Sequence, residues 1–153
     1  MKKYKLAVVG ATGVVGRTVL KVLQEKNLPI SEYVFFASSK SAGKTIHFME
    51  KNYTIKELTE NSFDDKFDFA VFSAGGDTSK KYAPIAVSNG CIVVDNSSAF
   101  RMDPTVPLVV PEVNADDIKK HNGIIANPNC STIQAVPVLK PLDDVYNINR
   151  IRW

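Results

Sequence analysis

The chain of 153 residues, with 44% hydrophobic and 23% charged side chains, is long enough to form one domain with a substantial core. Its net charge of +3 comes with scattered lysines, so it lacks the basic stripe of a protein that binds nucleic acid or an anionic membrane. Its two cysteines are too few for a disulfide framework and lack zinc-ligand spacing, and no apolar run is long enough to span a membrane. We therefore expect a cytoplasmic protein without a metal site.

The first predicted elements are a buried strand, a glycine-rich turn and a helix. Residues 6–9 are continuously apolar, and residues 19–23 carry apolar side chains at helical spacing. Between them Gly10 permits a tight turn, Gly13 lets the backbone approach a pyrophosphate, and Gly16 lets the helix lie close to the strand. The pattern predicts a nucleotide-binding unit; the alternative is a structural turn without a ligand. The candidate cofactor contacts are Gly10, Ala11, Thr12, Gly13, Val14, Val15 and Gly16.

A second strand is predicted over residues 33–37, and the loop that follows it bears on the choice of cofactor. An NAD-selective site usually presents Asp or Glu to the ribose hydroxyls here, whereas residues 38–44 hold serines and lysines. Hydroxyl and ammonium groups suit a 2′-phosphate. The loop therefore predicts NADP, with Ser38, Lys40 and Ser41 as contacts; the alternative is a basic loop that is simply solvated.

Two short alternating stretches follow, over residues 45–50 and 53–58. Their pattern predicts a hairpin inserted at the edge of the sheet, with Lys51 and Asn52 between its two arms. His47 lies in this hairpin and His121 lies at the end of a short polar helix predicted over residues 115–121. We interpret both histidines as solvated or structural.

Another apolar strand is predicted over residues 67–72, and small residues follow it. Small side chains at the carboxyl end of a parallel strand keep open the crevice in which ligands of such sheets bind. Ser73, Ala74 and Gly75 are therefore candidate cofactor contacts. A helix capped by Asp77 or Thr78 is predicted to run from there to Asn89, bent by Pro84.

The next predicted strand covers residues 91–95, with Cys91 in the core. Polar residues follow at the same edge of the sheet. Ser97 is a candidate cofactor contact, and Arg101 offers a planar fork of donors that can hold a phosphate or carboxylate at two points. The alternative for Arg101 is a surface ion pair with Asp103.

Cys130 is the predicted reactive residue. An extended segment over residues 123–126 leads into a helix that begins near this cysteine, and a helix N-terminus favours the thiolate form. Asn129 can cap the helix, whereas Pro137 is expected to kink it. The alternative is that Cys130 is a small buried hydrophobic residue. Residues 147–153 are interpreted as a strand that begins but is not completed.

Six segments occur in an order that closely resembles the amino-terminal half of bacterial aspartate-semialdehyde dehydrogenases. They are residues 10–16, 38–44, 73–76, 97–101, 110–114 and 127–132. The resemblance covers essentially the whole chain. It implies an α/β fold in which residues 1–153 form one Rossmann-like domain, a doubly wound and mostly parallel sheet with helices on both faces. That domain would bind NADP and carry the nucleophile.

The resemblance also implies a reaction, the reversible reductive dephosphorylation of aspartyl 4-phosphate, which serves the synthesis of lysine (through diaminopimelate), threonine and methionine. By position, Cys130 would form the acyl-thioester, and Arg101 with Asn129 would hold the substrate phosphate. Many family members have arginine where this chain has Lys40, which supplies a charge but no fork. The partners implied are an acyl phosphate or semialdehyde and inorganic phosphate.

This chain departs more from the family in another way. Full-length family members form homo-oligomers and continue into a second domain that carries the histidine acid/base, and that domain is not in these residues. We therefore expect this chain to be a half-enzyme that binds NADP but turns over little. Two other functions remain open at this stage. One is a reductase of N-acetylglutamyl phosphate, and the other is a non-catalytic NADP-binding module; a plain scaffold without a ligand is the remaining alternative.

Overall fold

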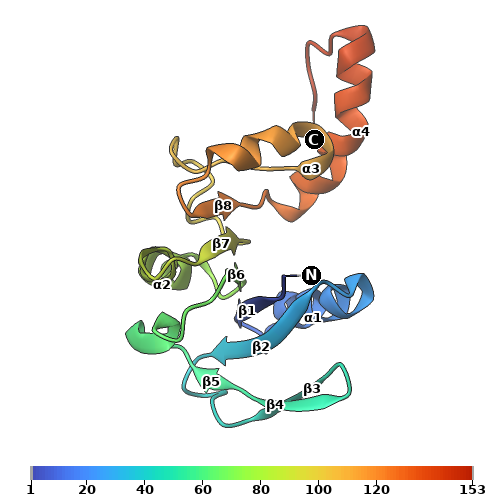
Figure 1. The fold of residues 1–153 in the computed structure, drawn as a ribbon. Coiled ribbons are helices and arrows are strands. Elements are labelled where there is room, and N and C mark those ends of the chain that lie inside the picture. Colours follow the sequence, from blue (N-terminus) through green and yellow to red (C-terminus); the bar gives the residue numbers. More distant parts are fainter. Residues whose placement is uncertain (1, 153) are drawn as a thin grey trace.

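Six strands form one parallel sheet in the order β5-β2-β1-β6-β7-β8 (Figure 1). The computed structural model describes residues 2–152. The strands are β1 (Tyr4–Val9), β2 (Ile30–Ala37), β5 (Lys56–Glu57), β6 (Phe69–Phe72), β7 (Ile92–Asp95) and β8 (Ile124–Ala126). Every pairing in this sheet is parallel. The predicted Rossmann-like α/β class is therefore confirmed.

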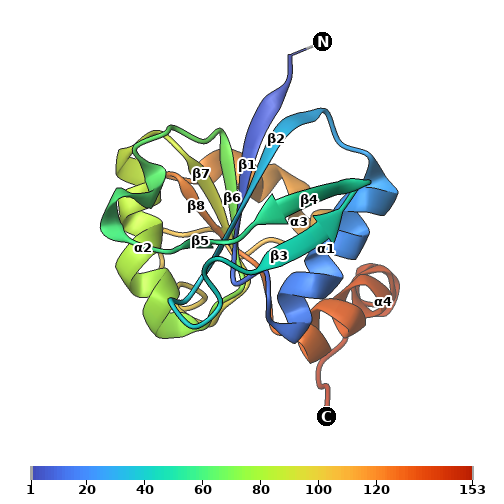
Figure 2. The ribbon, with the colours of Figure 1, turned by 90° about the horizontal axis from the view of Figure 1, so that it is seen from below.

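Helices cover both faces of the sheet, with α1 on one side and α2 on the other (Figure 2). The helices are α1 (Val14–Lys26), α2 (Gly76–Ser88), α3 (Pro111–Asn114) and α4 (Cys130–Tyr146), with 3-10 turns η1 (Glu60–Phe63) and η2 (Ala115–Lys120). No helix within residues 2–152 is both long enough and apolar enough to cross a membrane.

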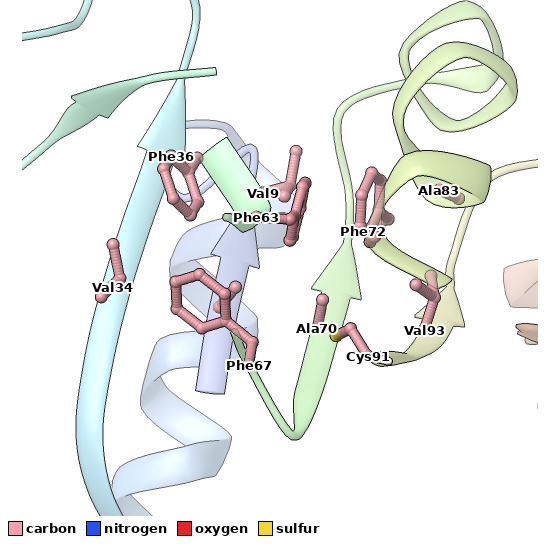
Figure 3. Close-up of a cluster of buried hydrophobic side chains, with 12 residues drawn as sticks. Val9, Val34, Phe36, Phe63, Phe67, Ala70, Phe72, Ala83, Cys91 and Val93 are labelled. Atoms are coloured by element: carbon pink, nitrogen blue, oxygen red, sulfur yellow. The ribbon is translucent and has the colours of Figure 1, made fainter. Parts of the chain in front are cut away.

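The core consists of two clusters, one on each face of the sheet, and β1 contributes to both. Ala7 and Val9 point into the cluster beneath α2, which also contains several phenylalanines (Figure 3). Leu6 and Val8 point into the cluster beneath α1. Successive side chains of a strand face opposite ways, so a strand that is covered on both faces must be apolar at every position. This requirement explains the unbroken apolar run.

The predicted hairpin forms, but its position was predicted incorrectly. Strands β3 (Thr45–Phe48) and β4 (Lys51–Thr54) pair with each other as a separate two-stranded sheet. The turn lies at Met49 and Glu50, whose φ values are 46° and 63°, and not at Lys51 and Asn52. The chain leaves the hairpin at the buried Ile55 and then forms β5, a parallel edge strand beside β2. The hairpin packs on the α1 face of the sheet through Phe48.

Helix α2 begins at Gly76, and its N-cap is Gly75 with φ 91°. Neither Asp77 nor Thr78 caps it, because the chain turns into the helix through the left-handed conformation that glycine adopts at little cost. Pro84 lies within the helix, as the sequence predicts. The predicted end at Asn89 holds to within one residue.

The segment after α4 was predicted incorrectly. Asn147, with φ 52°, ends α4, and residues 148–152 have no regular structure, while Trp153 lies outside the described residues. A strand needs a neighbour to accept its hydrogen bonds, and no described strand lies beside this segment. Helix α4 itself contains Pro137 and Pro141, has no buried residue, and projects away from the sheet in Figure 1.

Candidate functional site

The glycine loop between β1 and α1 is held by close backbone contacts. A Cβ atom on Gly10 would lie 2.4 Å from the carbonyl oxygen of Ser73, and one on Gly16 would lie 2.1 Å from the carbonyl oxygen of Gly10. A Cβ on Gly13 would make only an ordinary contact, 3.5 Å from that same oxygen. Gly10 and Gly16 therefore set the packing of strand and helix, whereas Gly13 keeps the surface of the loop open.

The N-terminus of α1 is free to bind an anion. Its N-cap is Gly13, no side chain caps the helix, and its first turn contains no acidic residue. The first N–H groups of a helix have no partner within the helix, and the positive end of the helix dipole lies there. Val14 at the start of the helix is 85% exposed, so the approach is open. This is the arrangement that binds phosphate groups in nucleotide-binding folds.

A cleft of about 500 Å³ lies above the carboxyl ends of β1, β2 and β6. It is at the point where the chain, having built the sheet outward from β1 to β2, crosses back to place β6 on the other side of β1. Open α/β sheets bind their ligands at such a switch point. The lining residues are Val9, Gly10, Thr12, Gly13, Ala37, Ser38, Ser39, Glu57, Leu58, Ser73, Ala74, Thr78 and Tyr82.

The cleft brings together part of the predicted cofactor set. Six of the predicted residues line it: Gly10, Thr12, Gly13, Ser38, Ser73 and Ala74. The others lie outside its lining: Ala11, Val14, Val15, Gly16, Lys40, Ser41, Gly75 and Ser97. The amides of Ser41 and Ala42 donate to the carbonyl of Ser38, which folds this loop into a compact turn, and Lys40 is exposed on it. The cofactor roles of all the predicted residues, inside and outside the lining of the cleft, stay predictions.

Glu57 is the only charged residue in the lining of the cleft, and the sequence did not predict it as a site residue. It reaches the cleft because β5 pairs with the end of β2, where Ala37 lies opposite Glu57. The alternating pattern of residues 53–58 had placed it in the hairpin. No signal within the two residues of β5 marks them as part of the sheet.

Arg101 joins the two loops that follow β7 and β8. Its Nε donates to the carbonyl oxygen of Asn127 at 2.9 Å, and its Nη2 donates to the carbonyl oxygen of Asn96 at 3.1 Å. The side-chain amide of Asn127 also donates to Oδ1 of Asn96 at 2.7 Å. The alternative ion pair with Asp103 does not form, since that carboxylate accepts from Thr105, whose hydroxyl and amide bonds lower the pKa of Asp103.

Cys130 is exposed and is the first residue of α4, as predicted. Asn129 caps the helix, accepting from the amide of Ser131 at 2.9 Å, and its Oδ1 lies 3.9 Å from the sulfur of Cys130. The histidines make contacts elsewhere: His47 Nδ1 lies 3.0 Å from Asn52 Oδ1, and His121 Nδ1 accepts from the amide of Gly123. Within residues 2–152, neither histidine is paired with the cysteine.

Whereas Cys130 is exposed, Cys91 is buried. Its side chain is 2% exposed and belongs to the core cluster beneath α2, so its predicted core role is confirmed. Burial, and secondarily the charge of Asp68, raises the pKa of its thiol to about 12. The thiolate is the reactive form of a cysteine, so Cys91 is chemically inert in the folded chain.

Asp95, the last residue of β7, was not predicted as a site residue. It is completely buried and accepts hydrogen bonds from the hydroxyls of Ser79 and Ser97, at 2.6 and 2.7 Å, and from the amide of Ser97 at 3.2 Å. The hydroxyl of Ser97 in turn accepts from the amide of Ala99. Asp95 therefore anchors the loop that leads to Arg101. An acidic residue at the end of an apolar strand, followed by serines, is the signal that could have revealed it.

Comparison with known proteins gives consistent results. Residues 5–121 match the family model described as semialdehyde dehydrogenase, NAD binding domain. The chain is 59% identical over 151 residues to an aspartate-semialdehyde dehydrogenase of Aquifex aeolicus, covering 97% of this chain and 44% of the relative. It is 56% identical over 153 residues to the enzyme of Campylobacter jejuni, covering 98% and 45%. The chain therefore spans less than half the length of these relatives.

Solved structures show the same likeness. Aspartate semialdehyde dehydrogenase II from Vibrio cholerae superimposes with a TM-score of 0.88 and 48% identity, over 94% of this chain and 43% of that one. The enzyme from Candida albicans, solved with NADP, gives a TM-score of 0.81 and 28% identity, over 95% and 48%. The match to the family model covers most of the chain. The chain thus belongs to the semialdehyde dehydrogenase family, whose NAD-binding domain it contains, and it is homologous to the amino-terminal half of aspartate-semialdehyde dehydrogenases.

Proposed function

We propose that this chain is the NADP-binding and nucleophile-bearing half of an aspartate-semialdehyde dehydrogenase. The observation that carries the proposal is the combination of an uncapped α1 N-terminus above the β1–β6 switch point with an exposed cysteine at the start of α4. The first is a site for a dinucleotide and the second is a site for a nucleophile. Relatives that share 56 to 59% of its residues carry the name of this enzyme.

The residues of the cleft fit NADP. The pyrophosphate would lie against Gly13 and the first turn of α1, where no side chain blocks the approach. The adenosine would lie toward Ser38, with Lys40 and Ser41 serving its 2′-phosphate. The homologue solved with NADP supports the choice of this cofactor. Bound NADP would accept a hydride when the semialdehyde is oxidised and donate one in the reverse direction.

Cys130 would form the covalent intermediate. In the oxidative direction the Cys130 thiolate would add to the aldehyde carbon, forming the C–S bond while the carbonyl π electrons move to oxygen. That carbon would then release a hydride to the cofactor as the C=O bond re-forms, which leaves a thioester. An oxygen of inorganic phosphate then attacks the thioester carbon, the C–S bond breaks, and the electron pair returns to sulfur as the thiolate. Arg101 and Asn129 would hold the phosphate. Two nitrogens of the Arg101 guanidinium donate to backbone carbonyls of the adjoining loops, and this fixed orientation supports the proposed role.

This chain by itself is expected to turn over little. The hydroxyl or amide groups near Cys130 are not bases, and the histidines are engaged in the hairpin and before β8. A nucleophilic thiol reacts efficiently when a neighbouring group can move its proton. In the homologous enzymes more than half of the chain lies outside the region matched here.

The first experiment measures the melting temperature of the chain with NADP and NAD in parallel. A ligand that binds only the folded state stabilises it by about 2.7 kcal/mol at a hundredfold excess over its dissociation constant. For a chain of this size that free energy corresponds to a rise of roughly 5 to 10 °C. We expect the rise with NADP. No rise with either nucleotide would refute cofactor binding by this half.

The second experiment measures intact mass after exposure to aspartyl 4-phosphate, with Cys130→Ser as the matched control. We expect an aspartyl adduct on the wild-type chain and none on Cys130→Ser. An adduct with N-acetylglutamyl phosphate instead would favour the reductase of that compound. A rise in melting temperature with NADP but no adduct would identify a non-catalytic NADP-binding module.

A further inference from the structure

A second cavity, of about 470 Å³, lies between α1 and the β3–β4 hairpin. Leu20, Phe48 and Ile55, which are 2 to 6% exposed, form an apolar floor. The hairpin forms a sheet of its own and packs on the α1 face of the main sheet, and the cavity lies between it and α1. Figure 2 shows the positions of the hairpin and α1. The remaining lining residues are Thr12, Arg17, Lys21, Gln24, Lys44, Thr45, Ile46 and His47.

The charged residues around this cavity are all of one sign. Arg17 and Lys21 project from α1, Lys44 precedes β3, and no Asp or Glu lines the cavity. Among residues 2–152, none of these three cations forms a salt bridge with a carboxylate. Cations gathered around one hollow repel each other, and an anion bound among them would relieve that repulsion.

Thr12 lines both this cavity and the cleft above the switch point. The cavity and the cleft therefore adjoin each other at Thr12 in the glycine loop. The switch-point cleft contains a carboxylate, Glu57, and no cation in its lining, whereas the α1–hairpin cavity contains the cations and no carboxylate. The cationic side chains therefore line the α1–hairpin cavity, whereas the switch-point cleft offers the N-terminus of α1 but no cation in its lining.

We propose that the α1–hairpin cavity binds a phosphate group carried on a small, partly apolar molecule, with Arg17, Lys21 and Lys44 as its ligands. The cations would contact the phosphate and the apolar floor would accept the remainder of the molecule. Two sources of the phosphate are to be distinguished: the 2′-phosphate of NADP, reaching past Thr12 in place of its contacts with Lys40 and Ser41, or a separate phosphorylated molecule. The first source rests on the proposed function and the second does not.

The test uses the double variant Arg17→Gln/Lys44→Gln, with Lys26→Gln as a matched control on the same helix. All three side chains are exposed, so the fold is expected to survive each change. Calorimetric titration would measure binding of four probes to each protein: NADP, NAD, adenosine 2′-monophosphate and inorganic pyrophosphate. Because hydrogen bonds between charged groups are strong, we expect the double variant to bind the phosphate-bearing probe with an affinity at least about tenfold lower than the wild type.

Each outcome decides a point. Weaker binding of NADP and adenosine 2′-monophosphate, with NAD unchanged, supports the inference and identifies the cofactor as the source. Weaker binding of pyrophosphate, with NADP binding unchanged or absent, supports a phosphate source other than the cofactor. If the wild type also fails to bind NADP, that failure counts against the proposed function alone. The inference is overturned if the double variant binds every probe as the wild type does, if Lys26→Gln is equally affected, or if no probe binds.

Discussion

Gly13→Ala and Gly16→Ala are expected to separate the folding role of the glycine loop from its binding role. A methyl group on Gly16 would lie 2.1 Å from the carbonyl oxygen of Gly10 and 2.9 Å from the Cα of Ala11. Both neighbours are backbone atoms, so α1 must move relative to β1. Overpacking of this kind costs about 3 kcal/mol, and the better helix propensity of alanine returns about 1 kcal/mol. The net loss of about 2 kcal/mol lowers the melting temperature by roughly 4 to 8 °C.

Gly13→Ala meets no such obstacle. Its φ of −70° suits alanine, and the nearest atom to the new methyl group is 3.5 Å away. Alanine is a poorer N-cap than glycine by about 0.5 kcal/mol, which is offset by the lower entropy of the unfolded chain. The melting temperature should therefore stay within about 2 °C of the wild type. If the pyrophosphate lies against this residue, NADP affinity falls all the same.

The assay is thermal unfolding followed by circular dichroism, without and with NADP, on the wild type and both variants. The expected result is a destabilised Gly16→Ala and a stable Gly13→Ala that responds weakly to NADP. The reasoning is refuted if Gly16→Ala has the same melting temperature as the wild type, or if Gly13→Ala is destabilised as much as Gly16→Ala.

Four further predictions concern buried groups and the two cysteines. Asp95→Ala leaves three donors without their acceptor and should lower the unfolding free energy by about 3 kcal/mol, measured by urea denaturation. Tyr33→Phe should stabilise the chain by about 1 kcal/mol, because the Tyr33 hydroxyl is buried without a partner among residues 2–152, and a loss of stability would contradict this. Iodoacetamide at pH 8 should alkylate Cys130 and spare Cys91. Burial raises the pKa of the Cys91 thiol from its ordinary value of 9.0 to about 12, so the unfolded chain loses this proton at a lower pH than the folded chain. The unfolding free energy should therefore fall as pH rises from 9 toward 12. Denaturation measurements at each pH should show a smaller fall for Cys91→Ala.

The glycine loop and the start of α4 could be predicted because each depends on local chemistry. Gly10 and Gly16 are required by contacts in which a Cβ would collide with backbone, and the order of strand, glycines and helix reveals that requirement. Cys130 follows a capping asparagine directly, so its position at a helix start could be inferred from neighbouring residues. The expected direct contacts of Cys130 and Arg101 with substrate were not accessible to the same reasoning and stay proposals.

The division of residues 45–58 into a hairpin (β3 and β4) and an edge strand (β5) could not be predicted, because β5 is a strand only through its pairing with β2. Lys56 and Glu57 are two exposed residues without periodicity of their own, and they become a strand only because the end of β2 lies beside them. The α1–hairpin cavity follows from that same division. The network around Asp95 joins residues sixteen positions apart, Ser79 and Asp95, and only the packing of α2 against β7 brings them together.

The two edges of the main sheet determine how it can grow. On one side β5 is two residues long and bears two exposed charged side chains. On the other, the carbonyl of Ala126 in β8 already accepts from Val109, and its amide donates to Pro107. An edge strand that has few free backbone N–H and C=O groups, or that bears exposed charged side chains, is a poor template for another chain. Although the centre of the sheet is among the most apolar parts of the molecule, its two edges thus disfavour the addition of a strand from another chain.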